Sequence, residues 1–474
     1  MISSEDLEKS TNSSPQIYPP SSTIYLLLPY IWWQLDDFFI GQARTAGLAT
    51  NFQLAQIDSE ELYTDTKFVL FAFAWTLLLW QISNINIRKL ALLITTLQTF
   101  LVFAQVAAPS IEILLVVRSL LGIGGAIFPG ALLLAISKLP RRKLATTIAI
   151  FVAVSPAEIV VAGPLLSVLV SFMKDLSILS WQTIFAIDGI IGLAVIFTLW
   201  VKLPLAVSTP PSTKFSCPID STSWKRKFLN FFDPKSFIFV IMFICCNLAT
   251  AAAPCYLAAH HRISFVSMPY FFFTVVSDLA PSSHLIFNLL TIFPYLISIT
   301  TTFIVARISD KRQIRGYFVA TCGLVSAAGF ATMSLIAMYN WNLWFSFFAI
   351  FPACIGSCGA MTTILSWALS SERSGFRQGL LLSILLGAAQ LAVIFSPAGV
   401  KPWWRAEDEP AHPRGLGASA ALMGLCALLA LVLRAYLMWK NSDSRREDHL
   451  YVPVEAEDAL DDMIEEKIVD RYVV

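Results

Sequence analysis

Twelve long apolar segments constrain this 474-residue chain more than any other feature of its sequence. A run of about 20 mostly apolar residues is what an α-helix needs to cross the hydrocarbon core of a bilayer. Since 56% of the residues are hydrophobic and 14% are charged, a soluble chain of this size would expose larger apolar patches than a monomer tolerates. The sequence therefore predicts an all-α membrane protein with twelve transmembrane helices. The segments are 23–43, 64–86, 89–108, 111–137, 144–172, 181–203, 236–259, 284–306, 316–338, 341–369, 377–397 and 416–439.

A polar stretch at 204–235 divides these segments into two sets of six. It is rich in Pro, Ser, Thr and Lys and has no apolar periodicity, which is typical of a linker. We therefore expect an N-terminal half at 23–203 and a C-terminal half at 236–440. Residues 1–22 and the acidic tail 441–474 have the composition of disordered cytoplasmic segments.

The basic residues predict the orientation of the chain. With the N-terminus inside, the inner loops hold dense groups of Lys and Arg, and the outer side holds seven: Arg44, Lys67, Lys174, Arg262, Lys401, Arg405 and Arg414. Because cytoplasmic loops carry the excess of Lys and Arg, we expect both termini in the cytoplasm.

Several classes of function are excluded by the same composition. The net charge of +1 leaves no strongly basic face, so we expect no nucleic-acid partner. The sequence contains no phosphate-binding loop, no set of metal ligands and no pairing of a nucleophile with a base. We therefore expect no enzyme activity, no metal and no cofactor, and a monomer whose partners are the lipid bilayer and a small-molecule solute.

Five of the ionisable residues inside the apolar segments are candidates for a functional site, because an ionisable side chain in a span costs about 2.5–3.5 kcal/mol and indicates such a site by default. They are Asp36, Asp37, Arg118, Glu158 and Asp188. At about 1.5 Å per residue, Asp36, Arg118, Glu158 and Asp188 lie about 10–20 Å deep, and we expect Arg118 to pair with Asp36. The alternative for Arg118 and Asp36 is a fixed ion pair that only holds two helices together. Asp37 could instead face water, and Glu158 and Asp188 could simply bond backbone or hydroxyl groups between helices.

Several motifs resemble one family. Residues 35–48, LDDFFIGQARTAGL, are similar to the span-one signature L-D-R-x-N-I-G-N-A-x-x-A-G-L of the anion:cation symporters of the major facilitator superfamily, and most of all to the fungal allantoate, nicotinate and pantothenate permease branch. The resemblance covers roughly residues 30–442 and implies a fold of two six-helix halves that cotransports organic anions with protons. The other motifs follow in order at 118–130, 181–189, 289–295, 306–316, 367–375 and 413–422.

The resemblance assigns roles to the intramembrane charges. Asp36 matches a proton or coupling position, and Arg118 matches a carboxylate anchor. The chain departs from the family at Asp37, where the family has Arg, at Gly125, where it has Glu, and at Asp188, which replaces Glu. With one cation beside two acids, one acid would hold a proton. We therefore expect the cargo to be a monocarboxylate or a largely neutral polar molecule.

A loop motif in the second half indicates a conformational latch. Ala306-x-x-x-Asp310-Lys311-Arg312, followed by Arg315, resembles the Gly-x-x-x-Asp-Arg loop of the superfamily. There an Asp near a helix end meets basic residues and holds one conformation. The alternative is a plain solvated turn at Asp310.

Three hypotheses for function remain from the sequence. The first is a secondary active transporter of the fungal plasma membrane that moves a monocarboxylate or vitamin-like compound by alternating access, driven by a proton gradient. The second is an exporter of a small metabolite or toxin, since Gly163-Pro164 resembles an antiporter kink. The third is a transport-inactive membrane sensor, supported by Gly125 and by a first-half loop at 81–89 that lacks Asp.

Overall fold

The computed structural model describes residues 20–43, 48, 87–137, 141–175, 180–202, 233–252, 284–339, 341–372, 375–400 and 413–450. These residues form eleven helices and no strand. The helices are α2 (Pro20–Ala43), α6 (Ile87–Val106), α7 (Ile111–Ser137), α8 (Arg141–Asp175), α9 (Trp181–Lys202), α11 (Pro234–Ala252), α13 (His284–Arg312), α14 (Arg315–Met338), α15 (Leu343–Ser371), α16 (Gly375–Val400) and α17 (Pro413–Leu450).

Each of these helices coincides with one of the predicted apolar segments, and the remaining segment, 64–86, lies outside the described residues. Seven of the described helices are long and apolar enough to cross a membrane. The all-helical membrane architecture is therefore confirmed over this part of the chain, and the full count of twelve stays a prediction.

Some helices extend further than the sequence predicts. α17 continues to Leu450, ten residues into the predicted tail, because no Gly or Pro interrupts the chain between Gly424 and Pro453. α2 begins at Pro20, inside the segment predicted to be disordered. α13 continues to Arg312, so Asp310 lies in a helical turn instead of a loop.

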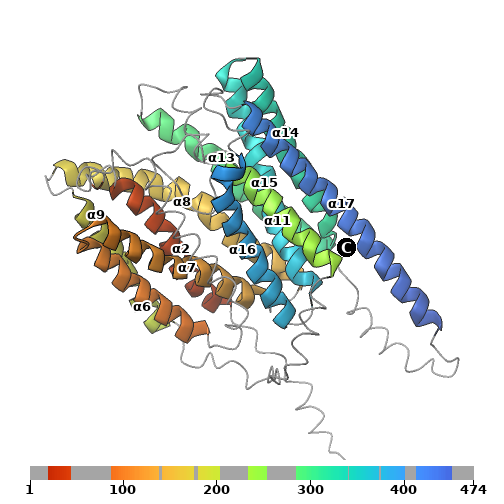
Figure 1. Cartoon of the computed structure of the whole chain (residues 1–474), viewed down its shortest axis with the longest axis horizontal. Coiled ribbons are helices and arrows are strands. Elements are labelled where there is room, and N and C mark those ends of the chain that lie inside the picture. Colours follow the sequence, from red (N-terminus) through yellow and green to blue (C-terminus); the bar gives the residue numbers. More distant parts are fainter. Residues whose placement is uncertain are drawn as a thin grey trace, which may run out of the picture. The chain divides into compact units, whose positions relative to one another are not determined.

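The chain divides into two compact units (Figure 1). The first comprises residues 1–139 and 162–232, and the second comprises 140–161 and 233–474. Helix α8 therefore begins in the second unit and ends in the first. Within the first unit α2 and α6 both pack on α7 and α9, and within the second α14 packs on α15 and α17 while α11 packs on α15, α16 and α17.

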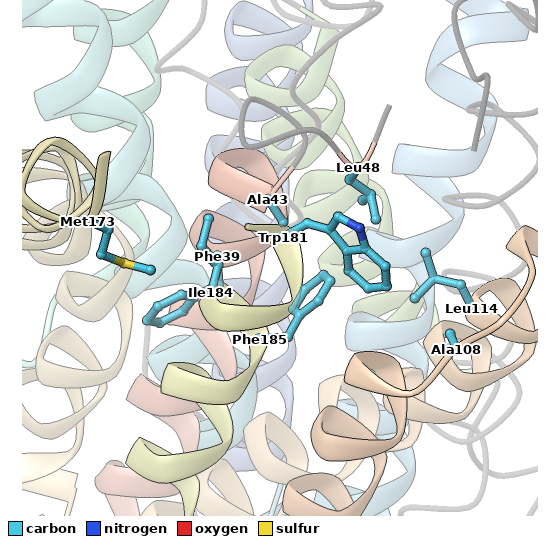
Figure 2. Close-up of a cluster of buried hydrophobic side chains, with 9 residues drawn as sticks. All are labelled: Phe39, Ala43, Leu48, Ala108, Leu114, Met173, Trp181, Ile184 and Phe185. Carbon is cyan, nitrogen blue, oxygen red and sulfur yellow. The ribbon is translucent and has the colours of Figure 1, made fainter. Parts of the chain in front are cut away.

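An apolar cluster packs the helices of the first unit against one another (Figure 2). Phe39 follows Asp36 by three residues on α2, and Phe185 precedes Asp188 by three residues on α9. Because residues three apart share a helix face, the packing of these two rings sets the rotation of both helices. The buried members are Phe39, Ala43, Leu48, Ala108, Leu114, Met173, Trp181, Ile184 and Phe185.

Small residues set the packing of α14 against α15 in the second unit. A Cβ atom added at Gly329 would lie 2.4 Å from the backbone nitrogen of Ala353, and one at Gly356 would lie 2.4 Å from that of Ser326. Such close approach is typical of membrane helices, whose association depends on van der Waals packing because lipid provides no hydrophobic driving force between them.

Candidate functional site

A buried ion pair joins α2 and α7 in the first unit. The Arg118 guanidinium donates through Nη1 to Oδ2 of Asp36. Both side chains are buried, with exposed fractions of 5% and 8%. Arg118 also lies over the ring of Phe185, with its Cζ atom 5.4 Å from the ring centroid. The predicted contact between Asp36 and Arg118 is therefore confirmed.

A third charged residue, Asp188 of α9, joins this pair. Its side chain is fully buried and interacts electrostatically with both Asp36 and Arg118. The indole Nε1 of Trp32 donates to Asp188 Oδ1 over 2.9 Å and also approaches the Asp188 carbonyl at 3.3 Å. Three helices thus bring one guanidinium and two carboxyl groups into one buried cluster, which we call the Arg118 cluster (Trp32, Asp36, Arg118, Phe185 and Asp188).

Local sequence explains how Trp32 reaches Asp188. Trp32 precedes Asp36 by four residues, so both side chains emerge from one face of α2. A Cβ atom at Gly192 would lie 2.5 Å from the Trp32 ring and 2.7 Å from the hydroxyl of Thr99. Glycine at 192 therefore lets the indole lie directly against α9. Our sequence reasoning missed Trp32 and Gly192, although a Trp and an Asp four residues apart in one span were a usable signal.

Several polar atoms of the cluster have spare bonding capacity. Nε and Nη2 of Arg118, Oδ1 of Asp36 and Oδ2 of Asp188 are buried and have no hydrogen-bond partner among the described residues. The amide oxygen of Gln98 on α6 is also buried without a hydrogen-bond partner among the described residues. Its Nε2 donates to the carbonyl of Leu121, one turn beyond Arg118. A buried polar group without a partner costs about 1–3 kcal/mol. The cluster is thus equipped to bind an anionic or polar group and a proton.

Three of the predicted site residues are not placed relative to this cluster. Asp37 lies in α2, Gly125 in α7 and Glu158 in α8, but their surroundings are outside the described part of the structure. Their roles stay predictions.

The predicted latch residue Asp310 is buried and bonds the start of α8. Its carboxylate accepts the backbone N–H groups of Ala145 at 3.0 Å and Thr146 at 2.7 Å, and the Thr146 hydroxyl at 2.8 Å. Both residues lie in the second unit with Asp310. A carboxylate in this place is stabilised by the positive end of the helix dipole. The alternative of a solvated turn at Asp310 is excluded by this burial.

The basic residues of the predicted latch separate into two groups. Arg315 is fully buried and places Nη2 3.4 Å from Asp310 Oδ1, while its Nη1 donates to the Ser366 carbonyl and to the Ser370 hydroxyl, 2.9 Å away. Lys311 and Arg312 are exposed at the end of α13. Arg315 therefore contacts the latch carboxylate, and the structure records no such contact for the two exposed cations among the residues it describes.

A second buried ion pair in this unit escaped the sequence reasoning. Lys235, at the start of α11, lies 2.8 Å from Glu372, which follows α15, and both side chains are at most 4% exposed. Asp233 lies 3.5 Å from Lys440 of α17 and 3.9 Å from Lys235. A signal was present, because Glu372 lies three residues after the predicted apolar segment 341–369. No group of residues suited to hold a metal ion occurs in the described ranges.

Comparisons with known proteins agree with this architecture. Residues 54–397 match the family model described as Major Facilitator Superfamily. The chain is 23% identical over 434 residues to an uncharacterized transporter of the fission yeast Schizosaccharomyces pombe, a match that covers 90% of this chain and 82% of the relative.

Two solved structures share the fold. One is the proton:xylose symporter XylE bound to 6-bromo-6-deoxy-D-glucose, with a TM-score of 0.66 and 16% identity over 89% of this chain and 95% of that one. The other is the human organic anion transporter MFSD10 (TETRAN), with a TM-score of 0.62 and 13% identity over 87% of this chain and all of that one. Because the family model spans well over half of the sequence, the chain belongs to the major facilitator superfamily and is a multi-pass membrane transporter, not an enzyme.

Proposed function

We propose that this protein is a proton-coupled secondary transporter of a small organic solute, a monocarboxylate or vitamin-like compound, and that it belongs to the fungal anion:cation symporter branch. It works by alternating access as a monomer in the plasma membrane, with both termini in the cytoplasm and the proton gradient as its driving force. The observation that supports this best is the Arg118 cluster, in which one buried guanidinium faces two carboxyl groups.

The substrate class follows from the free atoms of Arg118. Asp36 occupies Nη1, and the Nε and Nη2 edge has no partner among the described residues. Two adjacent guanidinium nitrogens match the two oxygens of a carboxylate, and such bidentate pairs combine strength with orientation. We therefore assign this edge to the carboxylate of the solute.

Charge balance supports coupling to protons. With both carboxyl groups ionised the cluster has a net charge of −1, and one proton makes it neutral. Binding a monocarboxylate would return the net charge to −1 unless a second proton enters with it. Since uncompensated charge within a membrane is costly, the anion and a proton are expected to bind together. A dicarboxylate would need two protons, which disfavours it.

The Asp310 contact supports a role in alternating access. It holds the first turns of α8, and α8 continues into the first unit. A bond at one end of a helix that both units share is well placed to stabilise one conformation of the transport cycle. This is the role we propose for Asp310 with Arg315.

The test is flux into proteoliposomes that contain the purified full-length protein. Labelled nicotinate, a monocarboxylate, is compared with nicotinamide, which is neutral and of similar size. Succinate is the dicarboxylate in the comparison. Symport predicts that nicotinate or another monocarboxylate accumulates when the outside is acidic, that succinate competes poorly, and that Arg118→Ala abolishes the flux. Glu112→Gln, which changes an exposed carboxylate on the same helix, is the matched control.

Three outcomes would reject the proposal. Flux that is driven only when the proton gradient is reversed would indicate an exporter. Binding of a compound without flux under either gradient would indicate a sensor. Normal flux in Arg118→Ala would place the substrate elsewhere in the protein.

A further inference from the structure

The side chain of Arg434 on α17 lies against the first turn of α14. Its Cζ atom is 3.4 Å from the ring centroid of Tyr317, which is a close cation–π stack. A Cβ atom at Gly316 would lie 3.2 Å from Arg434 Cβ and 3.4 Å from its Cδ. Glycine at 316 therefore makes room for the aliphatic stem, and the side chain is held between the two helices, which lie side by side in Figure 1.

Among the residues whose side chains the structure describes, no carboxylate forms an ion pair with this guanidinium. The nearby acids of the same unit already contact other cations: Asp310 contacts Arg315, Glu372 contacts Lys235, and Asp233 contacts Lys235 and Lys440. Nη1 of Arg434 is buried and has no hydrogen-bond partner among the described residues. The charge of Arg434 thus lacks a counter-charge from the protein in the part of the chain that is described.

The side chains around Arg434 are exposed and mostly apolar or aromatic. Tyr317 is 51% exposed, Val432 is 49% exposed, and Met438 and Trp439 are 51% and 65% exposed. Arg434 precedes Lys440 by six residues, so it lies about 9 Å deeper along the helix. Trp and Tyr gather at membrane interfaces, and a long basic side chain at this depth extends its charge toward the headgroups.

We infer that Arg434 and Tyr317 form a binding site for the phosphate group of an anionic phospholipid. The guanidinium supplies donors that match phosphate oxygens, and the Tyr317 ring fixes its plane. Arg307, Lys311 and Arg312 are exposed on α13 in the same unit and add positive charge near this end of the bundle. With the predicted orientation, this end faces the cytoplasmic leaflet, where anionic lipids are concentrated.

The experiment measures lipid binding to the purified full-length protein by native mass spectrometry, with phosphatidylserine and phosphatidylcholine as probes. We expect phosphatidylserine to bind more tightly, and Arg434→Gln to weaken that binding about tenfold, the loss of one charge-assisted contact. Arg414→Gln is the matched control, because Arg414 is an exposed arginine at the other end of the same helix. It should change phosphatidylserine binding less than twofold.

A second variant keeps the test informative if Arg434→Gln does not fold. Tyr317→Ala retains the charge and removes the ring, and it should also weaken phosphatidylserine binding, whereas Tyr317→Phe should not. Equal binding of the two lipids, or unchanged phosphatidylserine binding in folded Arg434→Gln or Tyr317→Ala, would overturn the inference. Binding of soluble glycerophosphoserine as tight as that of phosphatidylserine would also overturn the inference, because the ligand would then be a free phosphate compound and not a lipid.

Discussion

Replacing Arg118 by methionine separates a structural ion pair from a transport site. The variant keeps a long side chain and removes the charge that contacts Asp36 and interacts with Asp188. Breaking a buried pair from one side costs about 3–5 kcal/mol, because the remaining charge stays buried without compensation. Since 1.4 kcal/mol is a factor of ten, the folded population should fall relative to the unfolded by about 10²-fold to about 4 × 10³-fold.

The double variant Arg118→Met with Asp36→Asn removes both charges of the ion pair and leaves Asp188 as the one ionisable group of the Arg118 cluster, which a single proton makes neutral. Asp188 keeps its bond from Trp32, so most of the lost stability should return. Asp36→Asn alone should cost less than Arg118→Met, because Asp188 still balances Arg118. Transport should be absent in both variants that lack Arg118, because the anchor for the solute is gone.

The measurements are thermal unfolding midpoints in detergent and flux in proteoliposomes, for wild type, both single variants and the double. Glu112→Gln should change the unfolding free energy by no more than about 0.5 kcal/mol, as an exposed substitution does. Recovery of transport together with stability in the double variant would show that the pair only holds α2 against α7. An unfolding midpoint of Arg118→Met equal to that of the wild type would show that the charges are not buried as the structure places them.

Three further predictions concern the coupling and the latch. Asp36→Asn should uncouple solute flux from the pH gradient and still permit exchange, which is measured as counterflow; unchanged proton dependence would remove Asp36 from the coupling pathway. Asp37→Arg turns a local charge of −1 into +1, and one unit charge at 4 Å is worth about 4 kcal/mol at an effective dielectric of about 20. The Asp37→Arg variant should therefore bind more anionic competitors better, and adding Gly125→Glu should partly reverse this change. An identical rank order of inhibitors in all variants would show that neither position faces the solute. Asp310→Asn removes the charge that holds the start of α8 and should lower the transport rate severalfold, whereas Lys311→Gln, at an exposed site, should not; equal rates in Asp310→Asn and wild type, measured as initial flux, would exclude the latch.

The sequence by itself determined the membrane helices, because the thickness of the bilayer sets their length and lipid sets their composition. Every described helix coincides with a segment predicted from apolar length alone. It also determined the contact of Asp36 with Arg118, since a buried guanidinium needs a counter-charge and the depth of each residue follows from the helical rise. Helix ends were less predictable, as α13 and α17 show, because polar residues without Gly or Pro can extend a helix beyond the apolar segment.

Only the tertiary structure decided which residues complete the two sites. Asp188 and Trp32 are 156 residues apart, and their hydrogen bond depends on how α2 and α9 rotate about their axes and on the space left by Gly192. Asp310 meets Ala145 and Thr146 across a comparable separation in sequence. A sequence pattern specifies the face of a helix, but it does not specify which helix that face meets. That choice is made by packing, where a missing Cβ atom or a single aromatic ring determines which polar groups come within bonding distance.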